Sequence, residues 1–402
     1  MTKYLLLLLT AIGFAQSKQE IKEAKGRRDT YLFAASTMPK KFNGSVPIEI
    51  VSDELLIQVT IHGKPYTFLF DTGAITILSD GLRKELGLAV ATSNKLTDAA
   101  GNVSSEDFYM IDELKLGEVT FSKVAAGSFS LDSFSLMLCR KIDGIFGSNL
   151  MRLGNWKVDY LNSKLSFSTD KLLPDSEFDT IDFDEGFSGT PVVFLDTGGY
   201  RFPAMIDTGN NGTIDMPEDL YQKTRLSKSG KFQTSYGKGF FSLSGNKEQT
   251  ERLGTADSLY LGNRLLRDQR LRISPSPMIL VGNEFLKQFG EIGISWKKKE
   301  MYLPKKTLPL ETEWSFGFTP LKDDGKIKVA VIWEKSPAKQ KGLEIGDVIL
   351  AINGQDVAGS TDEFWCGMRE RFKKESSLEL EIEKANGQRK MVLLDRYDLL
   401  KP

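Results

Sequence analysis

Two stretches of the chain share a hydrophobic pattern that ends in Asp-Thr-Gly. In the first, residues 56–70, two apolar segments flank a His62-Gly63 turn, and the second segment ends at Asp71. In the second, residues 192–206, two apolar segments flank a Gly-Gly turn and end at Asp207. Short apolar segments joined by a glycine-containing turn predict a β-hairpin. We therefore expect each acid at the end of the second strand of a hairpin.

The residues that follow each acid repeat a second pattern. An apolar segment that ends in glycine comes 76 residues after Asp71, at Gly147, and 75 residues after Asp207, at Gly282. A short amphipathic segment and a last predicted strand follow each glycine. The chain therefore contains a diverged tandem repeat of about 120 residues, which predicts two lobes of similar fold.

A third Asp-Thr-Gly, which begins at Asp196, falls in the hairpin turn of the second repeat. No apolar run of matching length follows its own strand, and no glycine-ending segment follows at the right distance. We interpret it as a turn in which Gly198 and Gly199 supply positive φ, and not as a source of a catalytic acid.

Composition disfavours several classes of function. The 402 residues suffice for two or three domains, and a net charge of −1 without a basic patch argues against nucleic-acid binding. His62 is the only histidine, so a Ser-His-Asp triad is excluded unless His62 belongs to it, and His62 lies in a tight turn. A histidine-rich zinc site is disfavoured for the same reason, and we predict no metal and no cofactor.

The two cysteines, Cys139 and Cys366, fall in different predicted domains. The sequence alone gives no reason to expect a disulfide between two separate domains. We therefore predict two buried free thiols rather than a disulfide.

The N-terminus has the pattern of a secretory signal peptide. Residues 1–15 combine a basic start, a short apolar core and a Gly-x-Ala exit. The alternative is an uncleaved membrane anchor, although this run is too short to span a bilayer and no later segment reaches that length. We expect export to the periplasm or the extracellular space, with no stable membrane span after signal cleavage. Residues 16–45 would be a pro-segment, a linker or a strand leading into the first lobe.

The doubled Asp-Thr-Gly motif, with a glycine-ending segment after each copy, resembles the pepsin and retropepsin group of aspartic proteases. The resemblance covers about residues 46–304. It implies a mostly β fold in which two double-ψ β-barrel lobes, residues 46–170 and 171–306, pack about a pseudo-twofold axis. Each lobe would supply one catalytic acid, Asp71 or Asp207, and the two acids would meet at the centre.

The resemblance also implies roles for the residues that follow each acid. The threonines would form hydrogen bonds across the axis, and the glycines would let backbone N–H groups approach the carboxylates. The segments that end in Gly147 and Gly282 would support both loops by packing beneath them. The supporting residues within the loops are Thr72, Gly73, Thr208 and Gly209.

Two features of the resemblance are less direct. The turn between predicted strands at residues 96–103 would be a flap over the cleft, with Asp98 and Gly101 in it, although a plain hairpin would look the same. Asn210 departs from the family pattern, because the residue at this place is usually small, as Ala74 is in the first lobe. An asparagine can still donate a hydrogen bond to the outer carboxylate oxygen.

The hydrophobic pattern changes after the second lobe. Residues 336–354 resemble the centre of a PDZ domain, and the resemblance spans about 314–394 of a domain placed at 307–402. Such domains add a peptide as a strand at a sheet edge and bind its terminal carboxylate with backbone N–H groups. The alternative is a domain that packs on the protease and binds no free peptide. The carboxylate-binding residues would be Phe316, Gly317 and Phe318.

The resulting hypothesis is an exported aspartic endopeptidase that cleaves polypeptides. Asp71 and Asp207 would share one proton and activate a water molecule, while the PDZ domain would bind peptide or protein C-termini. An alternative from another class is a catalytically weak or inactive scaffold that binds peptides in its cleft and its PDZ groove. A third hypothesis is a sensor protease with one specific target.

Overall fold

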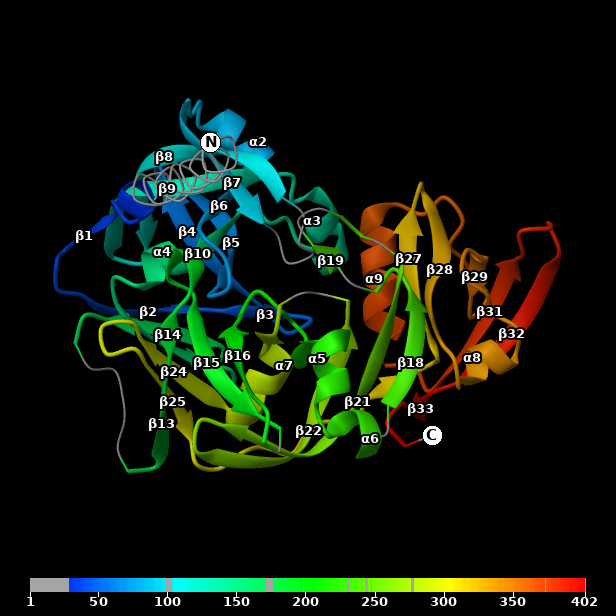
Figure 1. Ribbon diagram of the computed structural model, residues 1–402. Helices are drawn as coiled ribbons and strands as arrows, with labels where there is room; N and C mark the ends of the chain where they lie inside the picture. The colour runs from blue at the N-terminus through cyan, green and yellow to red at the C-terminus, as the bar shows by residue number, and fades with distance from the viewer. Residues whose placement is uncertain are drawn as a thin grey trace, which may run out of the picture.

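The computed structural model is mostly β. Figure 1 shows two lobes and a third body beside them that carries the C-terminus. The signal-peptide prediction for residues 1–15 and the flap prediction for Asp98 and Gly101 lie outside the described residues. The structure describes residues 29–97, 103–170, 176–197, 199–229, 232–239, 241–242, 245–246, 248–275, 278–372 and 374–401.

Lobe 1, residues 46–170, contains a closed six-stranded β-barrel. The strands pair around the ring in the order β4, β5, β10, β6, β9 and β8, and β8 pairs with β4 to close it. The elements of this part of the chain are β1 (Ser36–Met38), β2 (Asn43–Pro47), β3 (Glu49–Val51), β4 (Glu54–Ile61), β5 (Lys64–Asp71), β6 (Ile77–Ser79), α2 (Asp80–Glu85), β7 (Val90–Thr97), β8 (Val103–Leu116), β9 (Val119–Phe129), α3 (Asp132–Leu138), β10 (Gly144–Gly147), α4 (Ser148–Met151), β11 (Asn155–Asp159) and β12 (Lys164–Ser168).

Lobe 2, residues 171–306, repeats this barrel. Its ring runs in the order β15, β16, β23, β17, β22 and β21, and β21 pairs with β15 to close it. Its elements are β13 (Phe178–Asp182), β14 (Asp184–Glu185), η1 (Phe187–Gly189), β15 (Pro191–Asp196), β16 (Arg201–Ile206), β17 (Ile214–Pro217), α5 (Glu218–Lys223), α6 (Leu226–Ser229), β18 (Phe232–Gly237), β19 (Phe241–Ser242), β20 (Gly245–Asn246), β21 (Gln249–Leu261), β22 (Arg264–Ser274), β23 (Leu280–Val281), α7 (Asn283–Leu286), η2 (Lys287–Phe289), β24 (Glu291–Ser295) and β25 (Glu300–Pro304).

The predicted hairpins are present in both lobes. In lobe 1, β4 and β5 are joined by His62 and Gly63, which have φ angles of 49° and 79°. In lobe 2, β15 and β16 are joined by a turn in which Gly199 has a φ of 102°. These positive φ angles suit the short turns that match strand twist. The prediction of a strand-turn-strand unit before each acid is therefore confirmed.

A third sheet joins the two lobes. Its strands follow the order β13, β25, β24, β11, β12 and β2, so that β11 of lobe 1 pairs with β24 of lobe 2 from Asn155–Ser295 to Asp159–Glu291. The strand β2 supplies the edge next to β12, and β1 pairs with β9. Within the described residues, the last part of segment 16–45 therefore forms strands that lead into lobe 1. One hydrophobic core cluster runs through both lobes.

The C-terminal domain, residues 307–402, has its own hydrophobic core, and Trp365 and Leu378 lie within it. In Figure 1 the helix α9 lies beside β27, on the side of the domain that faces the two lobes. The elements of the domain are β26 (Trp314–Ser315), β27 (Phe318–Asp323), β28 (Lys326–Trp333), α8 (Pro337–Gln340), β29 (Val348–Ile352), β30 (Gln355–Asp356), α9 (Asp362–Phe372), β31 (Ser377–Glu383), β32 (Arg389–Asp395) and β33 (Tyr397–Asp398).

The C-terminal domain shares a β-sheet with lobe 2. The strand β28 pairs with β18 through Ser235–Trp333, Tyr236–Ile332 and Gly237–Val331. Two further backbone hydrogen bonds, from Lys238 to Ala330 and from Glu334 to Thr234, extend this contact. The domain is therefore packed against lobe 2.

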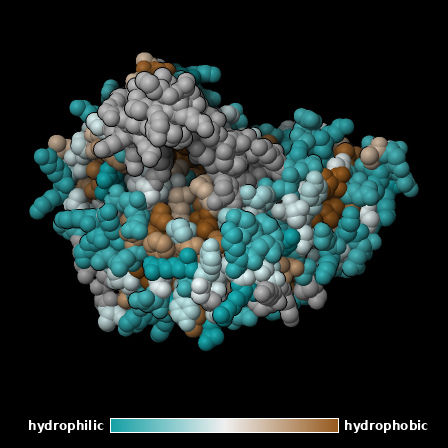
Figure 2. Space-filling model, viewed as in Figure 1, coloured by the Kyte–Doolittle hydropathy of each residue, from teal (hydrophilic) through white to brown (hydrophobic). Residues whose placement is uncertain are grey.

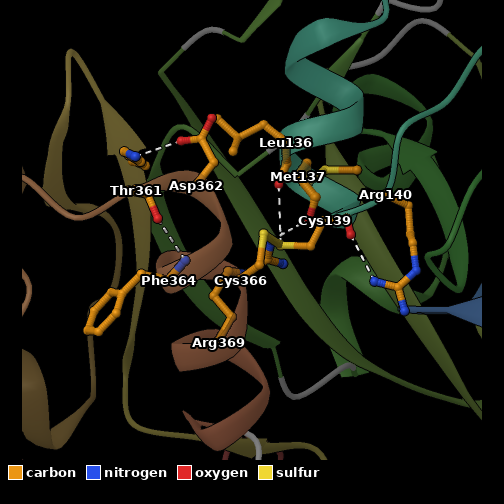
Figure 3. The surroundings of a disulfide bond; sticks show 10 residues. Leu136, Met137, Cys139, Arg140, Thr361, Asp362, Phe364, Cys366 and Arg369 are labelled. Carbon is orange, nitrogen blue, oxygen red and sulfur yellow. Dashed lines mark hydrogen bonds and ion pairs between the residues drawn. A yellow bond between two sulfur atoms is a disulfide. The ribbon is translucent and has the colours of Figure 1, made fainter.

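The prediction of two free thiols is wrong. Cys139 and Cys366 form a disulfide that joins the C-terminal end of α3 in lobe 1 to α9. Figure 3 shows α3 and α9 side by side at this bond, with Arg369 directed toward α3. The Arg369 guanidinium donates hydrogen bonds to the Met137 carbonyl and, at 3.6 Å, to the Cys139 sulfur. The two cysteines are 227 residues apart in the sequence, and no local sequence pattern indicates that the two helices meet.

Candidate active site

The structure brings Asp71 and Asp207 together at the junction of the two lobes. Asp71 is the last residue of β5, and Asp207 follows the last residue of β16. Their two carboxyl groups lie close enough that each shifts the pKa of the other. Asp71 is buried, at 7% exposure, and Asp207 is partly buried. Figure 2 shows hydrophobic residues gathered in the hollow between the lobes on this face of the molecule.

Backbone N–H groups hold each carboxylate in place. Asp71 Oδ1 accepts hydrogen bonds from Gly73 N at 2.7 Å and from Ala74 N at 3.1 Å. Asp207 Oδ1 accepts one from Gly209 N at 3.0 Å. Such bonds favour the ionised form of a carboxyl group. They therefore oppose the effect of burial on the pair.

Only glycine fits at the third position of each motif. A Cβ atom on Gly73 would lie 2.5 Å from Asp207 Cγ, and one on Gly209 would lie 2.2 Å from Asp71 Cγ. Each glycine thus leaves room for the carboxyl group of the other lobe. The requirement for glycine comes from this close approach.

The two threonines form a symmetric hydrogen-bond network across the axis. Thr72 N donates to Thr208 Oγ1 at 3.0 Å, and Thr208 N donates to Thr72 Oγ1 at 3.1 Å. Each hydroxyl then donates to a carbonyl of the opposite lobe, Thr72 to Ile206 at 2.6 Å and Thr208 to Phe70 at 2.8 Å. Both threonines are fully buried. The network fixes the two loops relative to each other.

The glycine-ending segments lie against the acid loops. The strand β10 runs parallel to β5, with Gly147 level with Asp71. A Cβ on Gly147 would lie 2.1 Å from the Ile75 carbonyl carbon, and one on Gly282 would lie 2.3 Å from the Gly212 carbonyl oxygen. This close packing is the physical reason for a glycine at both places.

Sequence reasoning missed two buried asparagines next to these glycines. Asn149 Oδ1 accepts hydrogen bonds from the backbone N–H and the hydroxyl of Thr76, both at 2.8 Å. Asn283 Nδ2 donates to the Thr208 carbonyl at 2.7 Å. An asparagine stands shortly after the glycine in both repeats, and this shared position was the available signal.

Asn210 turns toward a further buried acid. Its Nδ2 donates to Asp215 Oδ2 at 2.7 Å, and its Oδ1 accepts from Gly212 N at 2.8 Å. The Asn210 amide thus bonds Asp215, whereas the sequence allowed a bond to the outer oxygen of Asp207. Arg272 Nε lies 3.8 Å from Asp215 Oδ1, which has no hydrogen-bond partner among the described residues.

The electrostatics of the pair are those of two acids that share a proton. Burial raises the pKa of Asp207 well above its usual range, and the charge of Asp71 raises it further. Burial also raises the pKa of Asp71, although hydrogen bonds from Gly73 and Asp207 oppose this. Two carboxylates so close cannot both ionise readily. The pair therefore titrates as a unit and retains one proton over a wide range of pH.

These buried acids predict how folding stability depends on pH. Burial raises the pKa values of Asp71, Asp207 and Asp215 above those of the unfolded chain. Their contribution to stability is complete below the unfolded values and is lost as pH rises through the folded ones. We expect a melting temperature several degrees lower at pH 8 than at pH 5, measured by circular dichroism. Asp215→Asn should reduce the difference; a melting temperature that rises with pH would contradict this reasoning.

The other predicted site residues lie apart from the pair. Asp196 ends β15 in the hairpin turn, where its Oδ1 accepts a hydrogen bond from Gly199 N at 2.8 Å. Gly198, the other predicted turn glycine, lies outside the described residues. No group of three His, Cys, Asp or Glu side chains that could hold a metal ion occurs within the described residues.

The predicted carboxylate-binding residues lie at the start of β27. Phe316 and Phe318 are buried and contact the ring of Phe372 at the end of α9, with centroids 6.1 and 6.3 Å apart. Gly317 has a φ of 87°, and its N–H donates to Ser315 Oγ at 2.9 Å. The loop before β27 thus packs against the end of α9.

Comparison with known proteins matches two parts of the chain. Residues 57–150 match the family model described as aspartyl protease, and residues 328–369 match the model described as PDZ domain. The comparison with curated proteins found no match.

Several solved structures are similar to the chain. An aspartic proteinase from Irpex lacteus has 14% identity and a TM-score of 0.43, covering 67% of this chain and 98% of that one. A retropepsin-like aspartic protease from Rickettsia conorii has 15% identity and a TM-score of 0.24, covering 33% and 94%. Basic 7S globulin from soybean has 10% identity and a TM-score of 0.41, covering 67% and 96%.

The family matches agree with the resemblance that the doubled motif indicated. The aspartyl protease match contains Asp71 and its glycine-ending segment, and the PDZ match runs from β28 into α9. Residues 57–150 of lobe 1 thus resemble an aspartyl protease, and residues 328–369 resemble a PDZ domain.

Proposed function

We propose that the protein is an exported aspartic endopeptidase. The observation that carries this proposal is the close approach of the Asp71 and Asp207 carboxyl groups, held in two loops that hydrogen-bond to each other. The ionised member of the pair acts as general base on a water molecule. The protonated member acts as general acid toward the carbonyl of the peptide bond, which gives a tetrahedral diol without a covalent enzyme intermediate.

The PDZ domain binds peptide or protein C-termini in this proposal. The strand β27 pairs with β28 on one side, and α9 lies beside its other side. A peptide added there would extend the sheet, and residues 316–318 would lie near its terminal carboxylate. Because β28 also pairs with β18, such a ligand would add to a sheet that continues into lobe 2.

Export is supported by the sequence of residues 1–15 and by the disulfide. Disulfides persist in oxidising compartments such as the periplasm and the extracellular space, and are rare in the cytosol. Cys139 and Cys366 form such a bond. Among the described residues, no helix has the length and apolar character needed to cross a membrane.

A peptide-binding scaffold without turnover is the second candidate. The Asn210 amide, which bonds Asp215 rather than the acid pair, is the observation that favours it. In that case the cleft and the PDZ groove would still bind peptides, but the pair would not activate water.

One experiment separates the two candidates. The mature chain from about residue 16 is incubated with unfolded casein between pH 3 and pH 8, with a pepstatin-type inhibitor or the Asp71→Asn variant as controls. Cleavage that both controls abolish is the result expected of the protease. If casein and a diverse peptide library both stay intact while peptides still bind, the scaffold replaces the protease.

A further inference from the structure

A third acid lies next to the pair, at the start of β4. The preceding turn, Ser52-Asp53, has φ angles of 51° and 65° and joins β3 to β4. In the β4–β5 hairpin, Leu56 is level with Leu69. If this register is continued by two residues, Glu54 is level with Asp71. Residues directly opposite each other on paired strands have side chains on the same face, with Cβ atoms about 5 Å apart.

The Glu54 carboxyl is enclosed at the junction of the lobes. The residue is 2% exposed, and the backbone of Asn211 from lobe 2 lies close enough to its carboxyl group to lower the pKa of Glu54 slightly against the effect of burial. Its Oε2 is buried and has no hydrogen-bond partner among the described residues. A buried carboxylate oxygen without a partner is costly, whereas a protonated carboxyl avoids the charge.

The charges around Glu54 are mostly negative. Burial raises the pKa of Glu54 well above its usual range, and Asp71, Asp207 and Asp53 raise it further in that order. One cation offsets part of this field, because Lys287 Nζ of lobe 2 pairs with Asp53 Oδ1 at 2.9 Å. Three carboxyl groups, those of Glu54 and the pair, therefore compete for protons.

Lobe 2 has no matching acid. In its hairpin Val192 is level with Met205, so the same continuation places Thr190 level with Asp207. Thr190 is also buried, at 5% exposure. The acid at this position is thus an asymmetry between the two halves of the site.

We propose that Glu54 is a positioning residue for the acid pair. Its carboxyl group is neutral at acidic pH, and once it is ionised its negative charge makes the pair keep its shared proton to higher pH. This inference rests on the proposed protease function. The added negative charge disfavours loss of the shared proton, because like charges in a poorly solvated site repel strongly. Glu54 would thereby extend the range of pH over which the pair holds one proton.

The first test is the pH profile of kcat/KM for cleavage of a peptide. Two variants remove the charge: Glu54→Gln keeps the shape, and Glu54→Thr copies the residue of lobe 2. We expect the alkaline limb of the profile to move to lower pH by on the order of one unit, with the acid limb unchanged, because Glu54 is neutral there. Glu54→Asp should move the limb back toward the wild-type position.

Glu49→Gln is the matched control. It removes a carboxylate from β3, the strand that pairs with β4, but at a site 48% exposed and paired with Arg140. Its pH profile should therefore match that of the wild type. A purely structural role for Glu54 would lower kcat/KM at every pH without moving the alkaline limb. That outcome, in both variants, would overturn the proposal.

The second test needs no turnover and separates this proposal from the proposed function. Infrared difference titration of the full chain follows the C=O stretch of protonated carboxyl groups. Wild-type protein should keep a protonated band above pH 5 that loses one component in Glu54→Gln and Glu54→Thr. If the variants show the same band as the wild type, Glu54 is not protonated, even if the enzyme is active. If the band is diminished but no peptide is cleaved, only the proposed protease function is overturned.

Discussion

Asp207→Asn is expected to lower the rate of peptide cleavage by about a thousandfold or more, whereas Asp196→Asn should leave the rate within about twofold of the wild type. Both acids begin an Asp-Thr-Gly sequence in lobe 2, so the two variants make the same chemical change at matched motifs. The Asp207 carboxyl lies next to that of Asp71, whose charge raises the pKa of Asp207. An asparagine there cannot hold or release the shared proton, whereas Asp196 only accepts a hydrogen bond from Gly199 in the turn.

The measurement is the initial rate of casein or peptide cleavage at the optimum pH, with circular dichroism to establish that each variant is folded. If Asp196→Asn lost as much activity as Asp207→Asn, the assignment of Asp207 as the second catalytic acid would be wrong. A folded Asp207→Asn variant with normal activity would exclude the pair as the catalytic centre.

Loss of the Cys139–Cys366 disulfide is expected to reduce the free energy of unfolding by about 2–5 kcal/mol. The bond closes a loop with a sequence separation of 227 residues. A cross-link over so long a loop removes much of the conformational entropy of the unfolded chain, which is why the expected effect is large. The change is Cys139→Ser with Cys366→Ser, measured by urea unfolding without reductant.

The matched control is the wild-type chain with and without a reductant. Reduction should lower the unfolding midpoint of the wild type toward that of the double variant and leave the variant itself unchanged. A double variant as stable as the oxidised wild type would show that packing alone holds α9 against α3.

The repeat in the sequence was sufficient to place the acid pair. Each hairpin needs only local information, since short apolar strands and turn glycines determine it, and β4–β5 and β15–β16 form as expected. The meeting of Asp71 and Asp207 then follows from the symmetry of two equal lobes. The support by Thr72 and Thr208 follows from the same symmetry.

Contacts between the PDZ domain and the lobes could not be predicted in this way. Whether Cys139 meets Cys366 depends on how α3 and α9 are placed, and no local pattern encodes the relative placement of two domains. The pairing of β18 with β28 depends on the same placement. Glu54 is different: the hairpin register that puts it level with Asp71 could be extended from the sequence alone.

The pairing of β18 with β28 bears on how the chain folds as it is synthesised. Lobe 2 emerges before the PDZ domain, and domains generally fold as units in order of synthesis. Until β28 arrives, β18 presents one edge with unpaired backbone groups, a surface that readily pairs with other chains. Nascent chains stalled after lobe 2 are therefore expected to self-associate, and completion of the PDZ domain would end their tendency to aggregate.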